Sequence, residues 1–538
     1  MAKGNRGVTV LMGESSTAPD SSTRYRVLVG LAMLAPAVFA LVTGNIWEDF
    51  FITFRCSLNL AQGHGLVYEA GRVVHVFTSP LGVLMPAAIS WVLRTDDPQL
   101  VLWVFRLAAC LALGGAWVLT AGRVQSSLAL GVTAGLWLFD AKLAAYATNG
   151  METGILVLFV MLAWRALLDR RVGLAGLALG GIMWTRPDGF VFVAALGAAA
   201  WLFPRETRLG WRDWFRIIAW GVALYAPWIL IAGWYYGSPV PNTILAKGVQ
   251  MSDPATLRQV LLYPFTFVFG RNAAHDAFMP PYYFFGGWPG QLWWLGKLLA
   301  LGAAAAAAWP RCARPARVAG LAFVLGGLYL TITPVAPWYC PAWQVLAYVA
   351  FGGLVAAGWE WSRLPRTGRL LVGAGAAGLI VVQAALFLAV CAQLRAQQRV
   401  IEWGVRRQIG LELRQAAHGP QETVFLEPLG YIGFYSGLAM RDTPGLCAPE
   451  VVALRRSGIR SMAGLIAAVR PDWAVLRASE YAVFTPAELA AFQRDYRLWK
   501  IHDVRRQVNE IAWLPGRDFL LFDAFYTIWR RVPPAPAQ

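Results

Sequence analysis

Residues 25–55 read YRVLVGLAMLAPAVFALVTGNIWEDFFITFR. The apolar stretch Tyr25–Gly44 is long enough to cross a bilayer as one helix. Glu48 and Asp49 follow a few residues later, so we place this carboxylate pair at the far surface of the membrane. Carboxylates are costly near membrane depth, which favours a functional role. The alternative is that the pair only marks the point where the chain leaves the membrane.

The composition is that of a membrane protein. The chain has 538 residues, of which 57% are hydrophobic and only 14% are charged, whereas about a quarter of a soluble domain is charged. Apolar runs recur along the chain and are separated by Arg clusters, which predicts a polytopic α-helical protein. The net charge of +17 could also indicate nucleic-acid binding. Because most Arg residues lie in short connectors, we interpret them as topology signals and expect no nucleic acid.

We predict about eleven spans, with residues 1–24 as a disordered cytoplasmic tail. The stretch Leu81–Leu93 is too short to span easily, so we expect an amphipathic helix on the membrane surface. The Arg-rich connectors then all face the cytoplasm, as the positive-inside rule requires. After the first span at Tyr25–Gly44, the others are expected near residues 100–121, 126–145, 153–168, 172–186, 189–203, 216–235, 290–309, 316–333, 341–358 and 369–392.

These spans define a membrane domain, residues 25–394, and a separate C-terminal region, residues 395–538. The membrane domain carries an outer loop at residues 45–98 and a long outer loop at residues 236–289. In the C-terminal region charges increase, and strand-like pieces alternate with helical stretches such as Pro486–Tyr496. This pattern predicts a small α/β domain on the outer side. The expected strands are Thr423–Leu426, Trp473–Leu476 and Phe525–Trp529.

The unusual polar motifs all fall on the outer face in this topology. Simple solvation of loops would place polar residues on both sides, so the asymmetry predicts an active site at the outer membrane surface. The motifs are Glu48-Asp49, Gly63-His64-Gly65, His75 with Thr78-Ser79-Pro80, Asn149–Thr153, Thr185–Gly189, Pro241–Lys247 and Pro337-Trp338-Tyr339.

Several of these residues suit particular chemistry. A carboxylate at position 48 or 49 could deprotonate a hydroxyl as general base or hold a divalent metal. Lys247 is a cation on the outer side, against the charge bias, and an anionic ligand would explain it. Arg186 could bind a phosphate, or it could simply pair with Asp188 to close a turn.

Other motif residues are candidate substrate contacts with ordinary alternatives. His64 and His75 could each be plain polar surface in the outer loop. Glu152 opens a predicted span, where an acid also complements the helix N-terminus. Asn242, Trp338 and Tyr339 complete the candidate substrate-binding set. The six cysteines show no metal-binding spacing.

Three segments near the start of the chain resemble the GT-C fold glycosyltransferases, most closely the bacterial arabinofuranosyltransferases of the AftB type. They are Glu48–Arg55, Asn59–Tyr68 and Thr78–Leu81, and Gly430–Gly437 resembles a block in that family's soluble C-terminal part. The resemblance implies a polyprenyl-phosphate sugar donor that is attacked on the outer face by an acceptor hydroxyl, with inversion. This chain departs from the family in having Glu48 for the usual aspartate and His75-Val76-Phe77 for Glu-Gly-Tyr.

Our hypothesis is therefore an inverting transferase in a bacterial inner membrane, with its active site and C-terminal domain in the periplasm. Asp49, with Glu48, would be the base, while Lys247, Arg186 and Arg55 would bind the lipid phosphate. The acceptor could be a glycan, a glycolipid or a protein. The hypothesis requires no cofactor and leaves the involvement of a divalent metal open. The alternative is a flippase or transporter of a lipid-linked sugar. It needs polar residues along the spans, which hold few beyond Asp140 and Lys142, interpreted as a local ion pair.

Overall fold

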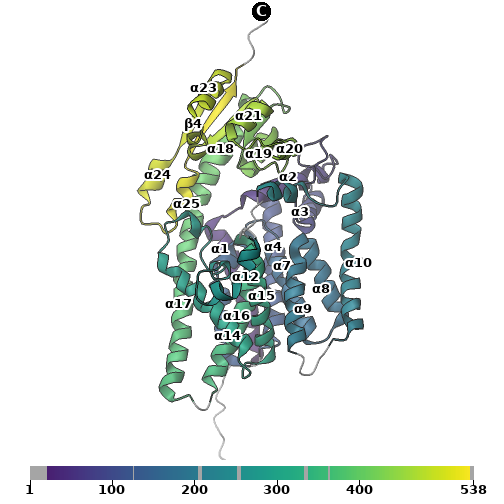
Figure 1. The fold of residues 1–538 in the computed structure, drawn as a ribbon, viewed down its shortest axis with the longest axis vertical. Helices are drawn as coiled ribbons and strands as arrows, with labels where there is room; N and C mark the ends of the chain where they lie inside the picture. Colours follow the sequence, from purple (N-terminus) through teal and green to yellow (C-terminus); the bar gives the residue numbers. More distant parts are fainter. Residues whose placement is uncertain are drawn as a thin grey trace, which may run out of the picture.

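The computed structural model describes residues 21–124, 126–203, 209–250, 256–332, 337–361 and 364–532. Most of the predicted cytoplasmic tail, residues 1–20, lies outside the described residues. A bundle of long helices forms one layer, and a smaller α/β domain lies at one end of it (Figure 1).

The bundle consists of apolar helices, as the sequence predicts. Among the described residues, six helices are long and apolar enough to span a membrane, and α5 with α6 forms a seventh candidate bent by 57°. The predicted spans at 153–168, 172–186 and 189–203 are shorter apolar helices, so the count of eleven stays a prediction. The bundle helices are α1 (Ser21–Thr43), α4 (Pro98–Ala121), α5 (Ser127–Leu138), α6 (Ala141–Thr148), α7 (Thr153–Leu168), α8 (Val172–Thr185), α9 (Phe190–Leu202), α10 (Trp211–Tyr236), α14 (Trp293–Ala308), α15 (Arg314–Ile332), α16 (Cys340–Trp359) and α17 (Arg366–Ala396).

Small residues allow these helices to approach closely. Helix α16 lies in the middle of the bundle with most of its side chains buried, including Trp343 and Tyr348. A Cβ atom placed on Gly320 of α15 would lie 2.3 Å from the carbonyl oxygen of Ala303 on α14. Only glycine permits this contact, which is typical of helix packing in membranes.

The outer layer of the membrane domain is built from shorter helices. Helix α3 buries Val83 and Ala87 but exposes Trp91 and Val92 at its end, so it has the two faces expected of a surface helix. The described parts of residues 236–289 hold α11 to α13 and η2. The outer elements are α2 (Glu48–Ala61), α3 (Pro80–Leu93), η1 (Pro187–Gly189), α11 (Asn242–Gln250), α12 (Thr256–Val268), α13 (Ala273–Asp276), η2 (Tyr283–Phe285), η3 (Gly290–Leu292) and η4 (Pro337–Tyr339).

The C-terminal domain has a five-stranded mixed sheet in the order β2-β1-β3-β5-β4. β1 is parallel to β2 and β3, while β5 is antiparallel to β3 and β4. The three predicted strands and the helix at 486 are confirmed, and two further strands were not predicted. The strands are β1 (Thr423–Leu426), β2 (Ala439–Asp442), β3 (Trp473–Arg477), β4 (Tyr496–Asp503) and β5 (Phe525–Arg531). The helices are α18 (Arg407–Ala416), α19 (Leu429–Ser436), α20 (Pro449–Arg456), α21 (Met462–Val469), α22 (Ala478–Ala482), α23 (Pro486–Asp495), α24 (Arg505–Glu510) and α25 (Arg517–Phe522).

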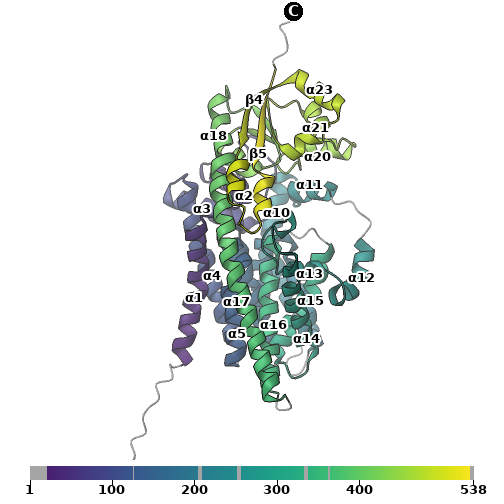
Figure 2. The same ribbon diagram turned by 90° about the vertical axis from the view of Figure 1, so that its left-hand side faces the viewer.

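No loop separates the two domains at the predicted boundary near residue 395. Helix α17 continues through a π-helical segment, η5 (Gln397–Arg406), directly into α18, and Figure 2 shows this helix running from the bundle into the C-terminal domain. The predicted boundary therefore falls inside one helix. A π-helical segment widens the turn and is frequent at functional sites. Here it carries the buried side chains of Gln398, Glu402 and Arg406.

Candidate functional site

A cavity of about 990 Å³ lies between the helix bundle and the C-terminal domain. Its lining combines charged and aromatic side chains from segments far apart in the sequence. The charged lining residues are Glu48, Asp49, Arg186, Asp188, Lys247, Arg406, Glu427, Arg477 and Asp523. The structure thus brings five predicted site residues of both charges into one cavity, together with the predicted Trp338 and Tyr339.

Asp49 lies in the first turn of α2 and contributes to the wall on the membrane side. The backbone N–H of Trp47 donates to the carbonyl of Asn149 at 2.9 Å, which fixes the start of this helix. Burial raises the pKa of Asp49, and the nearby cations Lys247 and Arg186 oppose that rise. A carboxylate that is held beside two cations can accept a proton from a hydroxyl group.

Arg186 and Lys247 form the cationic end of the cavity. Arg186 follows α8, and its Nε donates to Asp188 at 3.1 Å while its guanidinium lies 4.0 Å above the ring of Tyr339. Glu152 is buried behind it, 3.6 Å from a guanidinium nitrogen. Arg186 thus closes the turn with Asp188 and also lines the cavity. Desolvation lowers the pKa of Lys247 on α11, and the charge of Asp49 opposes this.

Glu48 faces the other way, toward the C-terminal domain. Its Oε1 accepts the backbone N–H of Gly430 at 3.0 Å, and its Oε2 lies 2.9 Å from a guanidinium nitrogen of Arg406. A Cβ atom on Gly430 would lie 2.1 Å from the carbonyl oxygen of Glu48, so only glycine fits there. Burial raises the pKa of Glu48 to about 8, against the pull of Arg406. Glu48 therefore joins α2 to α19 and η5. This arrangement does not support the predicted role of Glu48 as a base together with Asp49.

Behind Glu48 lies a buried network of charges that sequence reasoning missed. Arg406 contacts Glu402 at 2.9 Å and Asp523 at 2.7 Å, and Asp523 in turn accepts from Arg477 at 2.6 Å. Burial alone would raise the pKa of Asp523, but Arg406 and Arg477 lower it to about 2. These residues come from η5, β3 and the segment after α25. No motif links them in the sequence, because only the fold brings them together.

A continuous aromatic strip connects the two ends of the cavity. Trp47 lies 5.8 Å from Trp338 and stacks on Tyr282 at 5.0 Å, measured between ring centroids. Tyr282 stacks on Phe519 at 4.1 Å. The strip then passes through Phe285 to Phe522 of α25, with each step at 5.0 Å.

Five predicted site residues lie outside the cavity lining: Glu152, which is buried behind Arg186, and Arg55, Asn242, His75 and His64. Arg55 donates to the carbonyl of Gly433 at 2.7 Å, so its guanidinium joins α2 to the C-terminal domain and does not face the phosphate position. The Nδ2 of Asn242 donates to the carbonyl of Gly445 at 2.7 Å. His75 is buried and stacks on Tyr236 at 4.3 Å, while His64 is exposed after α2.

The residues around Asp49 do not fit a divalent metal. Among the described residues, no group of three His, Cys, Asp or Glu side chains is arranged to hold an ion. The neighbours of Asp49 are the cations Lys247 and Arg186, and Glu48 is turned toward Arg406. Calcium and magnesium sites need several oxygen ligands, and the residues around Asp49 do not supply them.

Curated relatives carry a name that matches the resemblance seen in the sequence. The chain is 28% identical over 246 residues to a terminal beta-(1->2)-arabinofuranosyltransferase of Mycobacterium tuberculosis, covering 41% of this chain and 39% of that protein. It is 26% identical over 273 residues to the protein of the same name from Corynebacterium glutamicum, covering 43% and 39%. The match thus spans about two fifths of these relatives' length. Residues 392–522 match a family described as "Domain of unknown function (DUF8728)".

Solved structures with the same architecture extend over nearly the whole chain. ArnT from Cupriavidus metallidurans in the apo state superposes with a TM-score of 0.55 at 14% identity, covering 96% of this chain and all of that one. The fold is that of ArnT. The ArnT structure bound to undecaprenyl phosphate gives a TM-score of 0.52 at 15% identity with the same coverage. With the curated relatives, the ArnT fold confirms the GT-C arabinofuranosyltransferase resemblance carried by Glu48–Arg55.

Proposed function

We propose that this protein is a membrane glycosyltransferase that moves a sugar, arabinofuranose in the first place, from a polyprenyl-phosphate donor to an acceptor hydroxyl. The site lies on the outer, periplasmic face of a bacterial inner membrane, and the acceptor belongs to the cell envelope. One observation carries the proposal: Asp49 lies beside Lys247 and Arg186 in a large cavity at the outer end of the bundle. The names of the relatives and the lipid phosphate bound by ArnT support it.

The cationic end of the cavity suits the phosphate of the donor. Lys247 supplies a mobile point charge, and Arg186 supplies a planar guanidinium that Asp188 and Tyr339 hold in place. Charge builds up on the phosphate as the sugar leaves it, so these two cations act where the transition state differs most from the bound substrate.

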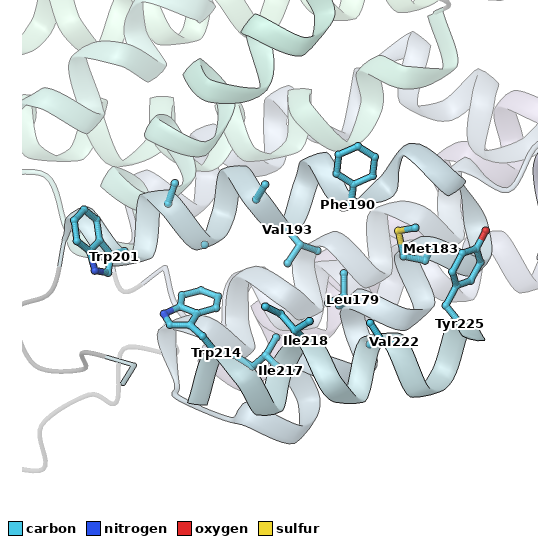
Figure 3. Close-up of a pocket in the computed structure, with 14 residues that line it drawn as sticks. Leu179, Met183, Phe190, Val193, Trp201, Trp214, Ile217, Ile218, Val222 and Tyr225 are labelled. Atoms are coloured by element: carbon cyan, nitrogen blue, oxygen red, sulfur yellow. The ribbon is translucent and has the colours of Figure 1, made fainter. Parts of the chain in front are cut away.

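An apolar groove next to the cavity suits the isoprenoid chain. It has a volume of about 620 Å³ and lies between α8, α9 and α10 (Figure 3). Leu179, Val193, Ile218 and Val222 are among its lining side chains, and hydrocarbon binding needs no polar partner. Phe190 lines both the groove and the cavity, so a lipid in the groove can place its phosphate at Arg186, a few residues before Phe190.

The reaction follows from these positions. Asp49 accepts the proton of the acceptor hydroxyl while the hydroxyl oxygen attacks the anomeric carbon from the face opposite the phosphate. The bond between that carbon and the phosphate oxygen breaks, and its electron pair leaves with the polyprenyl phosphate. The products are the inverted glycoside and a lipid phosphate held by Lys247 and Arg186.

The test is transfer by the purified full chain from labelled polyprenyl-phosphate arabinose to an arabinose oligosaccharide. We expect Asp49→Asn to lower the rate by about 10²–10⁴-fold, the usual contribution of a general base. Asp96→Asn, a change at an exposed acid outside the cavity, should retain the wild-type rate. Full activity of Asp49→Asn would contradict the proposal.

The transporter alternative finds no support in the polar residues of the bundle. Lys142 donates to the carbonyl of Ala277 at 2.7 Å, and Asp140 accepts from Gln344 at 2.8 Å. The predicted ion pair between the two is therefore wrong, since each is satisfied by other groups. Neither residue lines the cavity. A labelled donor that changes membrane side without forming a glycosidic bond would favour the transporter.

A further inference from the structure

Two parallel strands of the C-terminal domain end at the cavity, opposite the membrane domain. Glu427 directly follows β1, and Arg477 is the last residue of the neighbouring strand β3; both line the cavity. After β1 the chain turns to β2 on one side, whereas after β3 it continues to β4 and β5 on the other. Open α/β sheets bind ligands where the connections from adjacent parallel strands diverge in this way.

We propose that this wall binds a sugar ring of an uncharged glycan acceptor, and we call Phe285, Glu427, Arg477 and Phe522 the acceptor wall. The inference rests on the proposed function, because it assigns the second substrate of that same cavity. It goes further in assigning the subsite to the C-terminal domain and in specifying an acceptor without phosphate or carboxylate groups.

Both aromatic members of the wall line the cavity, and Phe522 is the exposed one. The ring of Phe522 lies 5.0 Å from that of Phe285, and the guanidinium of Arg477 lies 4.9 Å above it. These contacts hold Phe522 in place, yet 41% of the residue remains exposed. A phenyl ring that is held from one side and open on the other offers an apolar platform for the C–H face of a sugar ring.

Glu427 supplies the polar contact of the wall. Its Oε2 lies 2.6 Å from a guanidinium nitrogen of Arg477, and 44% of its side chain is exposed. A carboxylate has about four lone-pair positions, so Glu427 can accept hydrogen bonds from two sugar hydroxyls while it stays paired with Arg477. The ion pair fixes its orientation, which limits the entropy lost on binding.

The charges of this region disfavour an anionic acceptor. The guanidinium nitrogens of Arg477 bind Asp523, Glu480 and Glu427, and those of Arg406 bind carboxylates as well. Among the described residues, the carboxyl groups that contact these two arginines are Glu48, Glu402, Glu427, Glu480 and Asp523. A phosphate on the acceptor would approach the exposed Glu427 and find both guanidinium groups occupied.

The cavity therefore sorts its two substrates by charge. The donor phosphate is drawn to Lys247 and Arg186, whereas a ring bearing only hydroxyls suits Glu427 and Phe522. The aromatic strip from Trp338 to Phe522 joins the two positions along one wall. Asp49 lies at the membrane-side end of that strip, next to Trp47, where the acceptor hydroxyl must arrive.

The test measures glycan binding without turnover. The full chain in lipid nanodiscs is titrated with an unlabelled methyl glycoside of an arabinofuranose trisaccharide, and with the same trisaccharide bearing one phosphate. We expect Glu427→Ala and Phe522→Ala each to weaken binding of the neutral trisaccharide by about tenfold or more. Binding of undecaprenyl phosphate should change less than about twofold. Glu427→Gln, which keeps a hydrogen bond to Arg477, should weaken binding less and serves if Glu427→Ala does not fold.

Glu510→Ala is the matched control, because Glu510 is an acid of the same domain on α24 and does not line the cavity. Unchanged binding of the neutral trisaccharide in the Glu427 and Phe522 variants would overturn the acceptor wall. Tighter binding of the phosphorylated trisaccharide by the wild type would overturn the charge argument. Since no turnover is needed, this failure is distinguishable from failure of the proposed function, which would appear as an active Asp49→Asn variant.

Discussion

The two walls of the cavity differ in how their charges are held. On the membrane side, Asp49, Lys247 and Arg186 line the cavity together, and the ammonium group of Lys247 forms no salt bridge with any described residue. On the C-terminal side, Arg406 and Asp523 are almost fully buried and contact each other at 2.7 Å. The charge of Lys247 therefore remains available to a ligand. Arg186 lines the cavity but also contacts Asp188 and Glu152, and the charges of the C-terminal side hold the protein together.

Glu48 and Asp49 show this difference between neighbouring residues. Both are acids in the first turn of α2, where a helix N-terminus favours negative charge. Because successive residues of a helix point about 100° apart, one faces the bundle side and the other faces Arg406 and Gly430. Similar side chains therefore have different positions: Asp49 lies near Lys247 and Arg186 in the cavity, and Glu48 joins α2 to the C-terminal domain.

The largest effect is expected for the membrane-side wall of the cavity, which Lys247 lines. Lys247→Ala should lower the transfer rate by about 10²–10³-fold, because one charge that stabilises the leaving phosphate is lost. The protein should still fold, since Lys247 belongs to no buried ion pair among the described residues. Initial rates with the labelled donor measure this effect. Arg258→Ala, which removes an exposed outer cation on α12, should leave the rate unchanged, and a fully active Lys247→Ala would remove the donor site from this wall.

A loss of stability is expected for the C-terminal side of the cavity, where Arg406 and Asp523 are buried. Arg406→Ala leaves Glu402 and Asp523 buried without their main partner, so the free energy of unfolding should fall by about 3–5 kcal/mol. The buried thiol of Cys447 reports this, because a labelling reagent reaches it only when the C-terminal domain opens. Labelling is compared across urea concentrations with that of Arg506→Ala, an exposed arginine on α24. Equal protection of Cys447 in both variants would contradict the buried network as a stabilising element.

The sequence predicts the fold better than it predicts the buried charge network on the C-terminal side of the cavity. Long apolar runs and Arg-rich connectors report span positions directly, and residues 423–426 form a short apolar run typical of a buried strand. The strands at 439–442 and 496–503 were missed because they are short or largely exposed, so they carry little apolar signal. The boundary predicted near residue 395 lies inside a continuous helix, because a change in composition does not require a break in a helix.

For the site, the signal lies in residues that are unusual for their place. Lys247 on the outer side and Arg186 beside a proline turn stood out, and both line the cavity. Arg406 and Arg477 are ordinary arginines in a charged region, and only tertiary contacts give them their role. Arg55 shows the opposite error. It lies close to the acidic pair in the sequence, but its side chain contacts the C-terminal domain.

Arg55 allows a direct test between the sequence hypothesis and the structure. Its guanidinium donates to the carbonyls of Gly433 and Leu438 at 2.7 and 3.0 Å. Arg55→Ala should therefore cost about 1–3 kcal/mol of stability through lost hydrogen bonds to a charged group. The KM for the donor should stay unchanged, because Arg55 does not line the described cavity. Steady-state kinetics at varied donor concentration decides, and a large rise in this KM would restore Arg55 as a phosphate ligand.

The smallest effect should separate Glu48 from Asp49 by pH. Burial raises the pKa of Glu48 from its ordinary value of 4.5 to about 8, so the folded protein binds a proton there that the unfolded chain releases. The stability from this proton is present below about pH 4.5 and is lost as the pH rises toward about 8. Glu48→Gln mimics the protonated side chain, so its Tm should fall less than that of the wild type between these limits. Asp49 also has a raised pKa, but both proteins retain it, and the difference between the two Tm profiles reports Glu48 alone. Parallel profiles would mean that Glu48 stays ionised beside Arg406 throughout this pH range. The contact between α2 and the C-terminal domain would then be an ion pair at every pH tested.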